Sequence, residues 1–217
     1  MGKAYKSIET ALIHAGEALD RITGAIAPPL VRTKTYRQPE FGERSKWQYS
    51  RGQNPTRSIL EEKLAALEGG GWATVYSSGL AAETMLFMTL RPGDNVVIPT
   101  EVYGGTSRLL KQVMGNFGIS FSTSEYKTER DIMKSIDRRT RYLFIESLTN
   151  PSLNAIDLSL VNEVSQKTGV PYVADMTFTP PCSIRAYEYG AEAVVHSISK
   201  YVAGHNDVIG GGRRYKK

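Results

Sequence analysis

The chain has 217 residues, of which 41% are hydrophobic and 23% are charged, as in a soluble globular protein with enough chain for one large domain. No apolar run reaches the roughly 18 residues that a membrane helix needs, and the N-terminus lacks the apolar segment of a secretion signal. Because the single cysteine, Cys182, cannot form an intrachain disulfide, the expected location is the cytoplasm, with Cys182 as a small packed residue. Three histidines without Cys/His spacing give no support to a metal site.

The positive charge is concentrated at the C-terminal end. Four basic residues within the last five, Arg213, Arg214, Lys216 and Lys217, account for most of the net charge of +5. We expect them to form a basic appendage after the three glycines at 210–212. The remainder has no basic stripe with interleaved aromatic residues, so nucleic-acid binding is a minor hypothesis that depends on this tail alone.

The first 56 residues are expected to be irregular, because Pro28, Pro29, Pro39 and Pro55 interrupt every window that might form a long element. After them, leucines at helical spacing predict a helix over residues 57–68. Thr56 is the expected N-cap of this helix, and the three glycines at 69–71 end it.

Short β-rich runs then alternate with helical windows. The runs lie at residues 73–76, 95–98, 119–122, 141–145, 172–174 and 193–196, and the helical windows at 80–90, 106–116 and 158–167. This alternation predicts an α/β fold in which a mainly parallel sheet carries helices on both faces.

Several of the predicted strands end in residues that could take part in catalysis or ligand binding. In Ser77-Ser78-Gly79, a strand runs into a helix whose N-terminus could cradle a phosphate, although an ordinary serine N-cap explains the same residues. Asp175 ends an apolar strand, either as a turn-forming carboxylate or as the counter-ion of a protonated ring nitrogen.

Tyr103 and Lys200 follow other predicted strands. Tyr103 offers an aromatic face beside two glycines, or simply packs in its loop. Lys200 follows the apolar run at 193–196, where open parallel sheets place ligands, although most lysines are solvated surface residues.

Six runs carry a resemblance to a known family. They are Tyr49-Ser50-Arg51-Gly52-Gln53-Asn54-Pro55-Thr56, Ser77-Ser78-Gly79-Leu80-Ala81-Ala82, Val102-Tyr103-Gly104-Gly105-Thr106, Glu146-Ser147-Leu148-Thr149-Asn150-Pro151, Asp175-Met176-Thr177-Phe178, and residues 197–207 from Ser197 to Asp207. In this order they resemble the Cys/Met-metabolism family of pyridoxal 5′-phosphate (PLP) enzymes, which includes cystathionine γ-synthases and γ-lyases. The resemblance implies a fold-type-I PLP-dependent transferase fold, as in aspartate aminotransferase.

The resemblance also implies three catalytic residues. Lys200 would bond covalently to PLP and later move protons at the substrate. Asp175 would keep the pyridine nitrogen protonated, and Tyr103 would stack on the ring and act as an acid–base group.

The other cofactor-binding residues follow from the same motifs. Gly79, Leu80, Ser197 and Ser199, with Ser78 beside them, would hold the phosphate. Asn150 would contact the 3-oxygen of the ring, Thr177 would lie beside Asp175, and Arg108 would face the cofactor or substrate. Tyr49 and Arg51 would reach the phosphate of a neighbouring subunit, which implies a homodimer or a homotetramer.

Some positions depart from the family pattern. Ser199 replaces a common threonine, Met176 replaces a common asparagine, and Gly105 occupies the position where methionine γ-lyases usually carry cysteine. The last departure favours the cystathionine γ-synthase and γ-lyase classes.

We therefore expect an N-terminal arm at 1–56 and a large PLP-binding domain at 57–217, incomplete at its C-terminal end, with no small C-terminal domain. The expected function is that of a transsulfuration lyase or transferase, which eliminates or replaces the γ substituent of amino acids such as homoserine esters or cystathionine, with cysteine as a further small-molecule substrate. The alternatives are an O-acyl-homoserine sulfhydrylase and an inactive PLP-binding or oligomerisation fragment.

Overall fold

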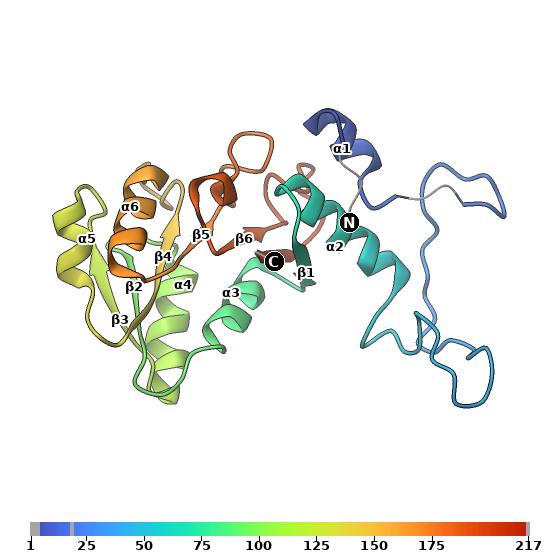
Figure 1. Ribbon diagram of the computed structural model, residues 1–217, viewed down its shortest axis with the longest axis horizontal. Coiled ribbons are helices and arrows are strands. Elements are labelled where there is room, and N and C mark those ends of the chain that lie inside the picture. The colour runs from blue at the N-terminus through green and yellow to red at the C-terminus, as the bar shows by residue number, and fades with distance from the viewer. Residues whose placement is uncertain (1–4, 18–19, 216–217) are drawn as a thin grey trace. The chain divides into compact units, whose positions relative to one another are not determined.

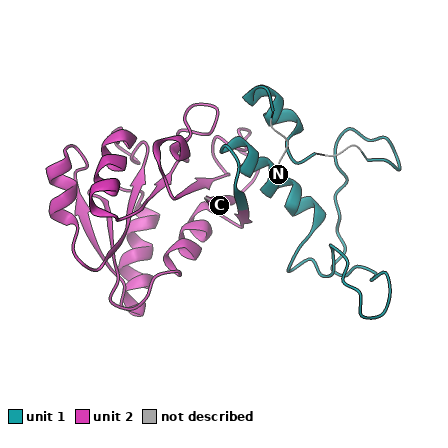
Figure 2. Cartoon of the chain, in the orientation of Figure 1, with its two compact units in different colours: residues 1–73 teal, residues 74–217 magenta. Residues whose placement is uncertain are grey.

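The computed structural model describes residues 5–17 and 20–215, which form two compact units (Figure 2). The first unit comprises residues 1–73 and the second residues 74–217. This division follows Ala73, whereas the sequence places the end of an arm at residue 56. The role of the first residues as an arm therefore stays a prediction.

The first unit contains α1 (Ile8–His14) and α2 (Pro55–Leu67). The expectation of an irregular segment missed α1, which Ser7 caps through a bond from the Thr10 N–H. The predicted N-cap of α2 is also wrong. Asn54 caps it, since its side chain accepts the Thr56 N–H at 2.9 Å and Pro55 occupies the first turn, where no intrahelical N–H is needed.

A seven-stranded sheet in the order β1-β7-β6-β5-β4-β2-β3 organises the second unit (Figure 1). The strands are β1 (Trp72–Tyr76), β2 (Asn95–Pro99), β3 (Ser120–Ser124), β4 (Thr140–Glu146), β5 (Tyr172–Asp175), β6 (Ala193–Ser197) and β7 (Gly211–Tyr215). The pairs β3–β2, β2–β4, β4–β5 and β5–β6 are parallel, and β6–β7 is antiparallel. The predicted α/β fold with a mainly parallel sheet is confirmed.

Helical segments cover the sheet through two apolar clusters on its opposite faces. They are α3 (Gly79–Phe87), α4 (Gly104–Arg108), the π-helical turn η1 (Leu109–Val113), the 3₁₀ turn η2 (Met114–Phe117), α5 (Glu129–Ser135), α6 (Leu158–Thr168) and the 3₁₀ turn η3 (Ala186–Tyr189). Alternate strand residues divide between the clusters. In β4, Phe144 joins Leu86 and Phe87 of α3, whereas Leu143 and Ile145 join residues of α5 and α6. The period-two pattern of each strand thus positions helices on both faces.

Strand β7 corrects the expectation of a basic appendage for Arg213 and Arg214, whereas Lys216 and Lys217 lie outside the described residues. Arg213 and Arg214 lie within the sheet, paired with Val195 and Val194 of β6, and are only 7% and 2% exposed. The guanidinium of Arg213 lies 4.2 Å from the ring centre of Tyr215, and that of Arg214 lies 3.6 Å from the ring centre of Tyr187. Both guanidinium groups therefore lie against aromatic rings, which stabilise their charge. The charge pattern of the sequence alone gave no indication of this strand.

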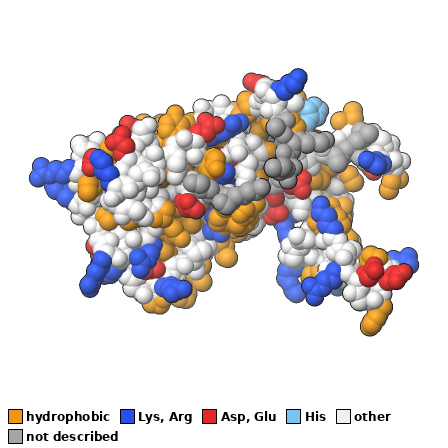
Figure 3. Space-filling model, in the orientation of Figure 1, with side chains coloured by type: hydrophobic (Ala, Val, Ile, Leu, Met, Phe, Trp, Pro, Cys, Tyr) orange, Lys and Arg blue, Asp and Glu red, His pale blue; other side chains and the backbone are white. Residues whose placement is uncertain are grey.

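The surface corrects one expectation and shows how charge is distributed. Cys182 is exposed, not packed. On the face shown in Figure 3, Lys and Arg side chains occur in separate groups with acidic and apolar side chains among them. Within the described residues, every helix is too short or too polar to cross a membrane.

Candidate active site

The candidate site lies at the carboxyl ends of the parallel strands, where Asp175 ends β5. The Asp175 carboxylate accepts the Thr177 N–H at 2.8 Å and the Thr177 hydroxyl at 2.5 Å. The same hydroxyl oxygen accepts the Ser197 N–H of β6 at 2.8 Å. One threonine side chain therefore connects the end of β5 to the start of the segment that carries Lys200. These bonds form the turn after β5 and leave the carboxylate at the strand end, where the counter-ion role of Asp175 stays a prediction.

The turn between β1 and α3 lies against the end of β6. Ser78 is the N-cap of α3, and its side chain accepts the Ala81 N–H at 3.1 Å. A Cβ added to Gly79 would lie only 2.7 Å from the Cβ of Ser197, so this close approach requires glycine. Gly79 and Leu80 lie in the first turn of α3, where a helix leaves N–H groups available to an anion.

The Lys200 segment turns directly after β6. The Lys200 N–H donates to the Ser197 carbonyl at 3.1 Å, and its side chain is exposed. The half-buried Ser199 hydroxyl accepts the Gly210 N–H at 2.9 Å and donates to the Gly210 carbonyl at 3.2 Å. Residues 199 and 210 thus close the loop between β6 and β7, which fixes the base of the segment that presents Lys200.

Glu146, which ends β4, organises a second part of the site. Its carboxylate accepts the Tyr103 N–H at 2.7 Å and the Asn150 N–H at 3.0 Å. The Tyr103 ring lies against Gly105, where an added Cβ would come within 2.2 Å of the ring. Exposed Arg108 ends α4, with its guanidinium beside Gly104. A single carboxylate therefore anchors the backbones of Tyr103 and Asn150 to the sheet.

Three buried carboxyl groups converge beneath these loops. Glu146 pairs directly with Asp175 across β4 and β5, on the sheet face that α3 covers, and Glu83 projects from α3 toward them. Glu83, Glu146 and Asp175 are 3%, 4% and 9% exposed. Burial raises the pKa of Glu146 to about 7. Burial also raises the pKa of Asp175, while its two bonds from Thr177 and the charge of His196 act in the opposite direction.

Tyr49 and Arg51 both lie in the first unit. The Arg51 guanidinium lies 5.0 Å from the centre of the Tyr49 ring, which is 40% exposed. The predicted reach of these two residues to a neighbouring subunit stays a prediction.

Sequence reasoning missed Glu83 and Glu146. Glu146 follows the apolar run Tyr142–Ile145, so the rule that identified Asp175, a carboxylate at the end of a buried strand, would have found it. Glu83 is the one acid in the α3 sequence GLAAETMLF, and helical spacing places it beside the buried positions 79, 82 and 86.

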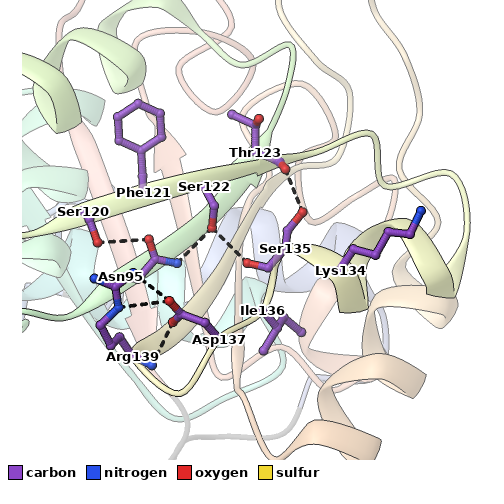
Figure 4. A pocket seen from close by; sticks show the side chains of 10 residues that line it. All are labelled: Asn95, Ser120, Phe121, Ser122, Thr123, Lys134, Ser135, Ile136, Asp137 and Arg139. Atoms are coloured by element: carbon purple, nitrogen blue, oxygen red, sulfur yellow. Dashed lines mark hydrogen bonds and ion pairs between the residues drawn. The ribbon is translucent and has the colours of Figure 1, made fainter.

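A separate pocket lies between β3 and the segment after α5 (Figure 4). Several of its polar side chains bind one another. Asn95 binds Ser122 and Ser120, and Arg139 binds Asp137. The residues predicted from the motifs do not line it. Among the described residues, no group of three or more His, Cys, Asp or Glu side chains has the geometry of a metal site.

Comparison with known proteins gives consistent relationships. The profile of the Cys/Met metabolism PLP-dependent enzyme family matches residues 9–213. Cystathionine γ-lyase of Bacillus subtilis is 38% identical over 94% of this chain and 54% of its own length. Cystathionine β-lyase of Coxiella burnetii is 39% identical over 94% of this chain and 53% of its own length. The crystal structure of Lactobacillus plantarum cystathionine γ-lyase, complexed with L-serine, superposes with a TM-score of 0.92 at 34% identity, over 97% of this chain and 55% of that chain. The chain thus spans about half the length of these proteins.

Proposed function

Because the chain belongs to the Cys/Met metabolism family of PLP-dependent enzymes, we propose that it is the cofactor-binding part of an enzyme that makes or breaks carbon–sulfur bonds at the γ carbon of amino acids. The observation that carries this proposal is the Thr177 hydroxyl, which bonds both Asp175 and Ser197 and so holds the β5 carboxylate beside the Lys200 segment.

The residues present fit PLP. The close approach of Gly79 to Ser197 brings the α3 N-terminus, a favourable place for phosphate, to the end of β6. Asp175 supplies a buried carboxylate for the pyridine nitrogen, and Lys200 supplies an amine on an exposed turn. When bound, PLP supplies an electron-accepting ring that stabilises negative charge on the substrate.

Each of the predicted site residues has a defined role in this proposal. Asp175 holds a proton at the ring nitrogen, and Thr177 orients that carboxylate through two bonds to the same oxygen. The first turn of α3, Ser197 and Ser199 would bind the phosphate. Lys200 would hold the cofactor covalently and would move protons at the substrate carbons. Tyr103, beside Gly105, would cover the ring and exchange a proton near the leaving group. Asn150 would contact the 3-oxygen, and Arg108 would face the substrate.

The first test measures PLP affinity after the replacement Thr177→Val, which keeps the shape of the side chain and removes the shared hydroxyl. We expect the dissociation constant, obtained from absorbance titration, to increase about tenfold or more, because Asp175 and the Ser197 N–H each lose a partner. Thr84→Val is the matched control, since the Thr84 hydroxyl bonds only the Leu80 carbonyl within α3. Equal affinities for wild type and Thr177→Val would contradict the proposed role of this hydroxyl.

A product assay determines the carbon at which the enzyme acts. With cystathionine as substrate, elimination at the γ carbon releases 2-oxobutanoate, and elimination at the β carbon releases pyruvate. The β position is the second candidate because a β-lyase is as similar to this chain as a γ-lyase. Pyruvate as the main product would overturn the γ assignment and leave the cofactor-binding proposal intact.

A further inference from the structure

Glu83 lies behind the predicted cofactor anchor and has no part in the mechanism above. It is 3% exposed, on the face of α3 that packs against the sheet. Its carboxyl oxygen accepts the fully buried Thr106 hydroxyl at 2.7 Å, and its carboxyl group also lies within hydrogen-bonding reach of Asp175. A buried side chain outside the predicted cofactor-binding set is thus placed to act on Asp175.

Two carboxyl groups in such contact do not both ionise in a buried environment, because their charges repel and neither is well solvated. One must keep a proton and donate it to the other. The surroundings determine which one keeps it. Asp175 accepts two bonds from Thr177, and the charge of His196 favours its anion, whereas Glu83 accepts one bond, from Thr106. Asp175 is therefore the better stabilised anion.

We propose that Glu83 is a positioning residue, a neutral carboxylic acid that donates its proton in a hydrogen bond to Asp175 and so keeps Asp175 ionised for the cofactor nitrogen. This inference deepens the proposed function and rests on it. A protonated Glu83 accepts a hydrogen bond from Thr106 and donates one to Asp175 at the same time, so both its acceptor oxygen and its acidic proton have a partner.

The electrostatics of the neighbouring elements agree with this arrangement. Burial is the largest cause that raises the pKa of Glu83 well above its ordinary value, and the charges of Asp175 on β5 and Glu146 on β4 act in the same direction. The hydrogen bond from Thr106 on α4 acts in the opposite direction on Glu83. Burial raises the pKa of Asp175, and the bonds from Thr177 and the charge of His196 on β6 oppose that rise. The burial of Glu83 and the two neighbouring carboxylates therefore favour a proton on Glu83, and the partners of Asp175 favour its charge.

The proton position can be measured without PLP. In protein labelled with ¹³C at the side-chain carboxyl carbons, we expect Glu83 to show the chemical shift of a protonated acid at pH 7, with Asp175 at the carboxylate shift. Glu83→Gln assigns the signal, and Glu163→Gln, which changes an exposed glutamate on α6, is the control. A carboxylate shift for Glu83, or a protonated Asp175, would overturn the proposal.

Two replacements then test the positioning role. Glu83→Gln keeps a donor for Asp175 and an acceptor for Thr106, whereas Glu83→Met fills a similar volume without either. We expect Glu83→Met to raise the pKa of Asp175, seen in the carboxyl titration, and to weaken PLP binding about tenfold at pH 8, with Glu83→Gln restoring both. Equal affinities for the two variants would refute the role. If wild type itself bound no PLP, the proposed function would fail, while the carboxyl titration would still report the proton on Glu83.

Discussion

The shared hydroxyl of Thr177 shows how one residue connects two strands into a site. Asp175 alone would be a carboxylate at the end of a strand, and Ser197 alone a residue in a turn. The Thr177 hydroxyl donates to Asp175 and accepts from the Ser197 N–H. A displacement of either strand end therefore alters the hydrogen bond to the other. Glu146 has the corresponding role for the loops of Tyr103 and Asn150.

Glu146 gives a prediction for the pH dependence of stability. Its pKa is about 7 in the folded protein against an ordinary value of 4.5, so between these pH values the folded protein keeps a proton that the unfolded chain loses. The free energy of unfolding should therefore fall as the pH rises from about 4.5 to about 7, by up to about 3 kcal/mol from this group. Urea unfolding of the protein without PLP at several pH values measures this slope.

Glu146→Gln is the variant that isolates this contribution. It should remove part of the slope and leave the part that Glu83 and Asp175 supply, since their pKa values are also raised. Glu163→Gln on the surface of α6 should leave the slope unchanged. A slope in Glu146→Gln as steep as in wild type would contradict the assignment.

At the scale of elements, β7 is the strand whose sequence fits its position least. Nε and Nη1 of Arg213 are buried without hydrogen-bond partners, and burial lowers the pKa of its guanidinium. Contacts with the rings of Tyr76 and Tyr215 offset only part of this cost. Such a residue in a strand that has neighbours on both sides should limit the stability of the sheet.

Replacing Arg213 by valine should therefore stabilise the protein. We expect Arg213→Val to raise the free energy of unfolding by about 1–3 kcal/mol, because it removes buried unsatisfied donors. The control is Arg141→Val in β4, where an exposed arginine pairs with Asp94 at 2.9 Å, and where we expect a loss of up to about 1 kcal/mol. A destabilised Arg213→Val would show that the guanidinium contributes more than it costs.

The elements that the sequence predicted well are those with a strong apolar pattern. The runs that became β2, β4, β5 and β6 were found within about one residue of their ends. Strand β7 was missed because two arginines beside a lysine-rich end are typical of solvated chain, and only neighbouring aromatic rings make this strand possible. The Asn54 cap was missed because Asn54 precedes Pro55, and Glu83 because the partners of a helical acid depend on tertiary packing.

At the scale of the whole molecule, the sheet places the candidate functional side chains where its parallel strands end. The strand ends at Glu146, Asp175 and Ser197 come together because β4, β5 and β6 are parallel neighbours. Such strand ends are the usual ligand side of an open α/β sheet.

Subunit complementation tests the predicted contribution of the first unit to a neighbouring site. Arg51→Ala and Lys200→Ala should each abolish or weaken PLP attachment alone. If Arg51 serves the neighbouring subunit, mixed oligomers contain sites in which both residues are intact, and attachment should recover when the two variants are unfolded and refolded together. Absence of recovery, in mixtures shown by sedimentation to contain oligomers, would place Arg51 outside the neighbouring site.

The central claim is that Lys200 holds PLP. The direct measurement is reduction of the PLP-treated protein with borohydride, followed by proteolysis and mass spectrometry of the modified peptide, with Lys127→Ala as the exposed-lysine control. We predict one stoichiometric adduct on Lys200, absent from Lys200→Ala and unchanged in Lys127→Ala. An adduct spread over several lysines, or one that persists in Lys200→Ala, would contradict the account.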